Sequence, residues 1–356
     1  MKSPPLFLLA GLAASLSSTG LFSSTKAFAG DHVRLTTGQT IAADVTEMGA
    51  NEVKVDAGGI AKTLPVNQIE YIQFDGEPKD LADARVAMRN GKYAEALAFV
   101  KRIKAADVTR DEIKQDVEFY RAILQARLAL AGSGSLKDAG KSLYDFETAR
   151  KNNYHWLEAS AAMGDLLVAD GKYDKAETYY GRLAATTWPE YQMRADVLLG
   201  RALEAQQQYD KAIEKYDAAL AVTAEGKEAD SQRFAAQLGK ASALAAGGKI
   251  EEAEKMIDEV IANADPENQE IYARAYVALG NCYKAAGKTK DALLAFLEVD
   301  LLYPGSPEQH AEALANLATL WTKVEKADRA TQARSQLETR YPRSRWISKP
   351  PTPPSG

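Results

Sequence analysis

The chain has 356 residues and a formal net charge of −5, and 46% of its residues are hydrophobic. A moderately acidic chain is a poor candidate for nonspecific nucleic-acid binding, which depends on a basic surface. The single cysteine, Cys282, excludes an intrachain disulfide. The stability of the fold must therefore come from packing.

Residues 1–29 have the pattern of a secretory signal peptide. Lys2 precedes an apolar run from Leu6 to Ala14, and Ala27-Phe28-Ala29 is a small-x-small cleavage site. The apolar run is much shorter than the roughly 20 residues that a membrane-spanning helix needs. We therefore expect cleavage after Ala29 and export to the periplasm or another part of a bacterial cell envelope. The mature chain should contain no integral membrane segment.

Residues 30–76 are expected to form a small all-β domain. Short runs rich in β-branched residues alternate apolar with polar positions, and turn signals such as Thr37-Gly38 and Asp56-Ala57-Gly58-Gly59 separate them. Five short strands in this length are too few for a sandwich, and they favour a small, partly open barrel.

This segment resembles an SH3-like or Sm-like barrel through Leu35-x-x-Gly38-x-x-Ile41 and through the turn from Pro65 to Ile69. The resemblance implies a module of the kind that binds RNA or proline-rich peptides in other proteins. The segment lacks a basic patch, however, and its aromatic residues are limited to Tyr71 and Phe74. We expect it instead to pack on the next domain or to orient it, with residues 76–78 as the linker.

From residue 79 to residue 343 the apolar residues have helical spacing. A motif like Gly171-Lys172-Tyr173-Asp174-Lys175-Ala176 recurs, and its alanines at 176, 212, 253, 292 and 330 are 36 to 41 residues apart. Each copy joins one Ala/Leu-rich helical run to another, and Gly suits the left-handed conformation that ends a helix. A period of this length predicts an α-solenoid of stacked helical hairpins.

We divide this region into about seven hairpins. They cover residues 80–106, 110–151, 155–185, 189–223, 229–263, 267–303 and 307–341. The pattern resembles the tetratricopeptide repeat, carried in the sixth hairpin by Tyr276, Leu279, Gly280, Tyr283, Ala292, Phe296, Val299 and Pro304. The resemblance implies a mainly α fold in which small residues lie where helices cross. The residues expected there are Gly164, Gly200, Gly239 and Gly280, with Tyr180, Tyr216 and Phe296 filling the space between hairpins.

Two hairpins end in Tyr-Pro-x-Ser, at Tyr303 to Ser306 and at Tyr341 to Ser344. This ending is similar to that of envelope tetratricopeptide proteins such as the Tol-Pal-associated coordinator and the repeat lipoprotein of outer-membrane β-barrel assembly. Proline stops one helix, and serine can cap the next. Residues 344–356 form a proline-rich tail that we expect to be disordered.

Catalytic chemistry has little support in the sequence. His32, His155 and His310 fall in separate segments, and no phosphate-binding glycine loop follows a strand. The pair His155-x-x-Glu158 offers two metal ligands, but a site needs at least a third. Cys282 lies beside the packing residues Gly280 and Tyr283, which favours a buried thiol over a nucleophile. We therefore expect no enzymatic activity, no cofactor and no metal.

Binding has more support, because tetratricopeptide arrays generally hold a partner in the concave groove lined by the first helix of each hairpin. Counted from the glycine positions, the groove residues are expected to be Asp165, Arg194, Arg201, Arg233, Lys240, Arg274, Asn281 and Lys284. Most are basic, so the groove could receive an acidic segment or a terminal carboxylate. Alternatively, these cations form salt bridges with neighbours such as Glu204, Glu228 and Glu270 and make a merely solvated face.

The sequence thus favours a non-catalytic exported scaffold that binds a protein or peptide partner in the cell envelope, and a basic groove would suit an acidic partner. One alternative is an accessory or regulatory subunit of an envelope or cell-wall assembly machinery. Another is a cell-wall-active protein in which the repeats position a site. Nucleic-acid binding through the small barrel would need a basic barrel surface, which its residues do not provide.

Overall fold

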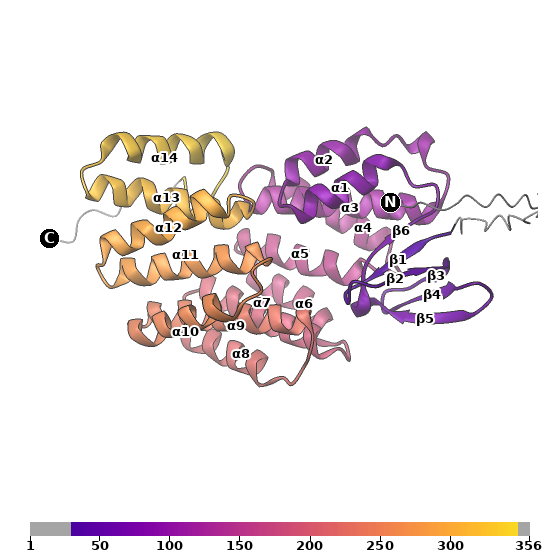
Figure 1. Ribbon diagram of the computed structural model, residues 1–356, viewed down its shortest axis with the longest axis horizontal. Coiled ribbons are helices and arrows are strands. Elements are labelled where there is room, and N and C mark those ends of the chain that lie inside the picture. Colours follow the sequence, from indigo (N-terminus) through magenta and orange to yellow (C-terminus); the bar gives the residue numbers. More distant parts are fainter. Residues whose placement is uncertain (1–29, 348–356) are drawn as a thin grey trace, which may run out of the picture.

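The computed structural model describes residues 30–347 (Figure 1). The expected signal peptide and most of the proline-rich tail therefore lie outside the described residues. Within them, a small β region is followed by a long array of paired helices.

The β region contains six short strands in two three-stranded antiparallel sheets. In chain order they are β1 His32–Leu35, β2 Thr40–Ala42, β3 Asp44–Met48, β4 Glu52–Asp56, β5 Ala61–Pro65 and β6 Ile69–Gln73. One sheet has the order β2-β1-β6 and the other β3-β4-β5. The sequence predicts five strands because the run from Ile41 to Val45 looks like one. The chain instead crosses between the sheets at Ala43, where Asp31 accepts hydrogen bonds from the Ala43 and Val45 amides.

Fourteen α-helices follow, and they form the seven expected hairpins. The pairs are α1 Lys79–Arg89 with α2 Tyr93–Arg102, α3 Asp111–Leu130 with α4 Leu136–Ala149, α5 Trp156–Ala169 with α6 Tyr173–Ala184, α7 Pro189–Ala205 with α8 Tyr209–Ala221, α9 Lys227–Ala246 with α10 Ile250–Asn263, α11 Gln269–Ala285 with α12 Thr289–Leu302, and α13 Pro307–Lys323 with α14 Ala327–Arg340. The prediction of a mainly α solenoid behind a small β region is confirmed.

The turns inside the hairpins use the left-handed conformation that the sequence predicts. Gly91, Gly171, Gly248 and Gly287 have φ angles from +69° to +85°. Glycine takes this conformation without the steric cost that a Cβ brings. Two hairpins place a side chain there instead, Gln207 and Glu325, each with φ of 61°.

Glycines also allow the helices to approach closely where aromatic rings cross them. The rings are Tyr180 at Gly164, Tyr216 between Gly200 and Gly239, and Phe296 at Gly280. A Cβ on Gly280, for example, would be 2.8 Å from the Phe296 ring. All three rings are at most 1% exposed. Each ring therefore fills the space that a glycine leaves, as the sequence predicts.

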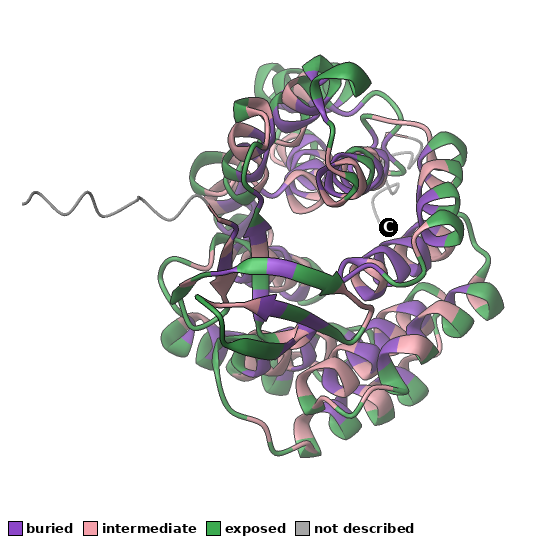
Figure 2. Ribbon diagram, turned by 90° about the vertical axis from the view of Figure 1, so that its right-hand side faces the viewer, coloured by how far each residue is buried: buried purple, intermediate pink, exposed green. Residues whose placement is uncertain are grey.

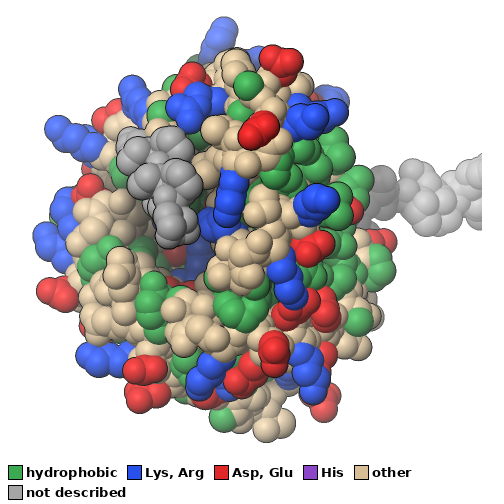
Figure 3. Space-filling view, turned by 90° about the vertical axis from the view of Figure 1, so that its left-hand side faces the viewer, with side chains coloured by type: hydrophobic (Ala, Val, Ile, Leu, Met, Phe, Trp, Pro, Cys, Tyr) green, Lys and Arg blue, Asp and Glu red, His purple; other side chains and the backbone are tan. Residues whose placement is uncertain are grey.

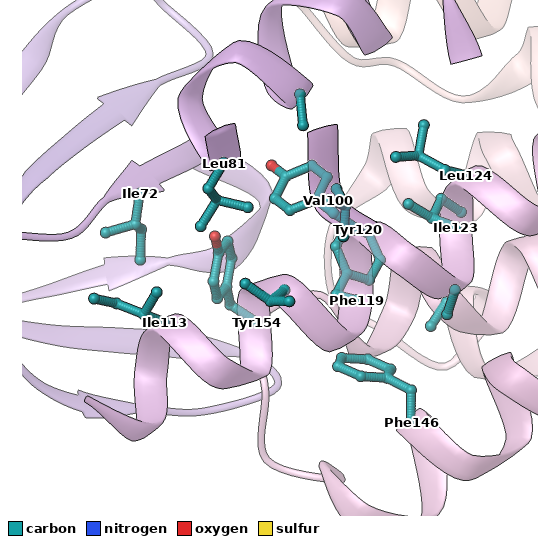
Figure 4. Close-up of a cluster of buried hydrophobic side chains, with 14 of the residues drawn as sticks. Ile72, Leu81, Val100, Ile113, Phe119, Tyr120, Ile123, Leu124, Phe146 and Tyr154 are labelled. Atoms are coloured by element: carbon teal, nitrogen blue, oxygen red, sulfur yellow. The ribbon is translucent and has the colours of Figure 1, made fainter. Parts of the chain in front are cut away.

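The β region and the first helices share one hydrophobic core. Ile72 on β6 faces Leu81 on α1, Ile113 on α3 and Tyr154, which lies between α4 and α5 (Figure 4). Because no separate core divides them, the β region is packed directly on the start of the solenoid.

The solenoid curves until its two ends meet, so that the helices surround an open centre (Figure 2). The amide of Arg343 donates to the Gly132 carbonyl oxygen at 2.7 Å, and the Ser133 hydroxyl donates to the Arg340 carbonyl oxygen at 2.7 Å. Ala131, in the α3–α4 turn, is buried among residues of α11 to α14. The second hairpin and the last are therefore in direct contact.

Candidate functional site

The centre of the ring is a cavity of about 700 Å³. Its wall comes from the first helix of six hairpins, α3, α5, α7, α9, α11 and α13, and from the α1–α2 turn. Figure 3 shows a hollow at the end of the molecule opposite the β region, with Lys and Arg side chains around it. A volume of this size is typical of ligand-binding cavities.

Half of the groove residues expected from the sequence lie in this wall, namely Asp165, Arg194, Arg201 and Arg274. The other four are elsewhere on the described surface and interact with neighbours. Arg233 pairs with Asp230, Lys240 with Asp217 at 2.6 Å, Asn281 donates to Glu312 at 2.9 Å, and Lys284 donates to Asn316 at 2.6 Å. The structure thus brings together the residues nearest the ring's axis and separates the rest.

The cavity wall is charged but not predominantly basic. It contains the five arginines Arg89, Arg127, Arg194, Arg201 and Arg274, and the six acids Glu158, Asp165, Glu228, Glu267, Glu270 and Glu308. The sequence analysis named Asp165 as a groove residue and Glu228 and Glu270 as neighbours of the groove cations. It missed Glu267 and Glu308, and it considered Glu158 only as a metal ligand. Glu158, Glu228, Glu270 and Glu308 each lie in the first turn of a helix. Acids are common there because they complement the helix dipole, so the sequence does not single them out.

Several charges in the wall form ion pairs with one another. Glu158 accepts from Arg194 at 2.7 Å and from Arg127 at 3.4 Å, and Glu270 accepts from Arg274 at 2.6 Å. Burial alone would raise the pKa of Glu158, but Arg194 and Arg127 lower it to about 2. Arg274 likewise lowers the pKa of Glu270. Both carboxylates therefore stay charged at neutral pH.

Arg201 differs from these paired arginines. Within residues 30–347, neither a salt bridge nor a hydrogen bond to another side chain is found for its guanidinium. Burial alone would lower the pKa of Arg201, but the negative charges of Asp165 and Glu308, both in the cavity wall, raise it. One oxygen of Asp165 already accepts a hydrogen bond from the Tyr180 hydroxyl at 2.9 Å. Arg201 is thus a cavity cation whose donors remain available to a bound anion.

The low pKa of Glu158 predicts a pH effect that can be measured. Because the pKa of Glu158 is lower in the folded protein than in the unfolded chain, its ionised carboxylate stabilises the fold. This contribution is fully present above pH 4.5, the pKa of the unfolded chain, and is lost as the pH falls toward about 2. Glu158→Gln should remove this contribution to the pH dependence of the free energy of unfolding, which corresponds to about one proton taken up on unfolding. Urea unfolding between pH 2 and pH 6 measures it. Equal slopes in wild type and variant would show that the pair with Arg194 is not formed in solution.

The three histidines lie apart, as their positions in the sequence suggest. His155 stacks on Phe119 and approaches Asp116, and buried His310 lies between Asp300 and Tyr341. Across the described residues, no group of three or more His, Cys, Asp or Glu side chains is arranged to hold a metal ion. Buried Cys282 donates weakly to the Ile250 carbonyl oxygen, and burial raises its pKa. These groups have packing partners rather than an open site.

Within the described part of the chain, every helix is too short or too polar to cross a membrane.

Comparison with known proteins identifies the type of repeat. Residues 161–230 and 238–307 match the tetratricopeptide repeat family model. These two segments of the solenoid are therefore similar to tetratricopeptide repeats. No curated protein matches the sequence.

Two solved structures illustrate the similarity, both at low sequence identity. A Rap protein crystallised with Competence and Sporulation Factor is 13% identical, with a TM-score of 0.55 over 73% of each chain. A tetratricopeptide repeat protein from Parabacteroides merdae ATCC 43184 is 18% identical over 73% of this chain and 91% of its own, with a TM-score of 0.45. The first of these likenesses shows that the fold of this chain resembles that of the Rap protein.

Proposed function

We propose that this protein is an exported, non-catalytic tetratricopeptide scaffold that binds a protein or peptide partner in the cell envelope. The partner enters the central cavity and presents a carboxylate to Arg201. Export is inferred from the leader of residues 1–29 and from the two Tyr-Pro-x-Ser endings.

The observation that carries this proposal is the central cavity with paired charges on its wall. Arg194 and Arg274 are held by Glu158 and Glu270, so their positions are fixed before a partner arrives. Fixed side chains lose little conformational freedom on binding. Arg201, which faces the same space without such a pair among the described residues, supplies the free donors for a charge-assisted hydrogen bond.

The comparison with solved structures supports the same class of function. The Rap protein of similar fold was solved in complex with Competence and Sporulation Factor. In this chain, the central cavity is the place with the size and polarity to hold a partner.

Arg201→Gln tests the proposal, and Arg233→Gln is its matched control. Both variants remove one cation from a first helix, but only Arg201 lies in the cavity wall. We expect Arg201→Gln to reduce partner capture about tenfold in crosslinking and pull-down from intact cells, because a charge-assisted hydrogen bond is lost. Arg233→Gln should capture the partner as the wild type does. Equal capture by all three proteins would contradict a cavity site.

A separate measurement addresses export. The mature protein should begin at Gly30 and should be found in the envelope fraction. N-terminal sequencing of protein purified from fractionated cells checks this, and an intact Met1 in the cytoplasmic fraction would contradict it.

A further inference from the structure

Helix α12 presents large hydrophobic side chains on a face that the fold leaves exposed. Leu294 is 63% exposed, Leu301 is 69% exposed and Leu302 is 59% exposed. Leu294 and Leu301 are two turns apart, and the partly buried Leu297 lies between them on the same side of the helix. We call Leu294, Leu297 and Leu301 the leucine stripe. It lies outside the cavity wall, on the outer surface of the ring.

The other hairpins show that folding does not require leucine at these positions. The alanines of the repeated turn, Ala292 in α12 among them, place five hairpins in register. Two residues after this alanine α12 has Leu294, whereas the other four hairpins have exposed polar residues. These are Thr178, Glu214, Lys255 and Gln332. Nine residues after it α12 has Leu301, whereas the others have small exposed residues. These are Ala185, Ala221, Ala262 and Thr339.

The number of exposed leucines on one face distinguishes α12 from an ordinary surface. A single exposed hydrophobic residue is common and needs no explanation. Ile60, in the β4–β5 turn, is such a residue and is as exposed as Leu294, at 63%. Several hydrophobic side chains on one continuous face instead mark a surface that contacts another molecule. The leucine stripe is therefore a candidate interface.

The helices on either side of the leucine stripe carry exposed charges of opposite net sign. Figure 1 shows α14 on one side of α12 and α10 on the other. Helix α10 exposes four acids and one lysine, namely Glu251, Glu252, Asp258, Glu259 and Lys255. Helix α14 exposes three arginines and two acids, namely Arg329, Arg334, Arg340, Asp328 and Glu338. The surface around the stripe is thus acidic on one side and mildly basic on the other.

A surface with this distribution of charge is complementary to itself. A two-fold rotation about an axis parallel to α12 places the leucine stripes of two copies against each other and brings α10 of each copy opposite α14 of the other. The repeat also puts opposite charges at the same level, because Glu252 directly precedes Ala253 and Arg329 directly precedes Ala330. A two-fold axis perpendicular to α12 would instead place the acids of α10 against each other.

We propose that the outer face of α12 is a dimer interface and that its partner is a second copy of this chain. The leucine stripes form the centre of the interface. Because the outer surface of the ring is convex, long side chains such as Glu252 and Arg329 make the flanking contacts. A membrane surface fits less well, since the acids of α10 would face anionic headgroups. Both cavities lie outside the interface, so the dimer does not depend on the proposed function.

Sedimentation velocity of the purified mature protein, over concentrations from about 1 to 100 µM, tests the interface. We expect the wild type to dimerise and Leu294→Gln combined with Leu301→Gln to raise the Kd at least about tenfold, because apolar area is no longer buried. Glutamine is a good helix former, so α12 should still fold, which circular dichroism checks. Ile60→Gln is the matched control and should dimerise as the wild type does. A monomeric wild type, or equal dimerisation of the leucine variant, would overturn the proposal.

Charge reversal tests the orientation of the two copies. Arg329→Glu and Glu252→Arg should each raise the Kd about tenfold, because a two-fold interface contains every substituted contact twice. The two substitutions together should restore the wild-type Kd. If the combined variant dimerises no better than either single variant, α10 does not face α14 and the axis parallel to α12 is wrong.

Flotation with vesicles of phosphatidylethanolamine and phosphatidylglycerol separates a membrane surface from a second copy. We expect the wild type to remain with the soluble fraction. If the wild type is monomeric and floats, while the variant with Leu294→Gln and Leu301→Gln does not float, the leucine stripe contacts lipid and the dimer is ruled out.

Discussion

Replacing Gly239 by Leu is expected to lower the free energy of unfolding by about 3 kcal/mol, near the upper end of what overpacking a core costs. Gly239 lies on α9, and a Cβ built on it would overlap the ring of Tyr216. The ring cannot retreat, because it is fully buried and lies equally close to Gly200 on α7. Urea unfolding followed by far-ultraviolet circular dichroism measures the change.

Gly181→Leu is the matched control for this prediction. Gly181 is also inside a helix, α6, but a Cβ there would meet nothing within 4 Å. Leucine has the higher helix propensity, so this variant should gain about 0.5–1 kcal/mol. A comparable loss in both variants would mean that the close approach at Tyr216 is not what requires glycine at position 239.

These glycines could be predicted from the sequence because the signal is local. Gly200 and Gly239 each interrupt an Ala/Leu-rich helical run shortly before the next turn, whose left-handed residues are Gln207 and Gly248, and Tyr216 lies near the middle of the intervening helix. The period of the repeat therefore predicts both the hairpins and the contacts between them. The same reasoning gave the seven hairpins in correct order, because each depends on its nearest neighbours in the chain.

Closure of the ring could not be predicted in this way. The hydrogen bond from Ser133 to Arg340 joins residues 207 positions apart. It depends on the small rotation that each hairpin adds to the last, which no local motif specifies. The cavity wall was foreseen only in part for the same reason. Whether Arg201 or Arg233 faces the axis is decided by curvature, although both lie on first helices.

The β region shows a second limit of local patterns. Alternation of apolar and polar residues predicts the strands well but does not reveal which sheet each strand joins. The break at Ala43 follows from hydrogen bonds to Asp31, whose carboxylate also pairs with Arg110 before α3 at 2.6 Å. Burial acts to raise the pKa of Asp31, but Arg110 and the backbone amides lower it. A contact with the helical array thus helps to fix the strand order.

Replacing Arg85 by Met is expected to cost about 3–5 kcal/mol, because it leaves two buried carboxylates without their cation. Arg85 on α1 donates to both oxygens of Glu77, at 2.7 and 2.8 Å, and to Asp116 on α3 at 3.0 Å. The three side chains are at most 5% exposed. Arg102→Met provides the comparison: its partner Asp80 is 3.0 Å away, but both side chains are solvent-accessible. That surface pair should be worth less than about 1 kcal/mol.

The location of this cluster predicts where the loss should appear first. Glu77 follows β6, Arg85 lies on α1 and Asp116 on α3, so one cation joins the β region to the first two hairpins. Contacts in a solenoid are made mainly between neighbouring hairpins, and a local defect need not spread along the array. In Arg85→Met, amide hydrogen exchange should accelerate in β6, α1 and α3 while α9 and α10 keep their protection. Uniform acceleration would instead show that the closed ring unfolds as a single unit.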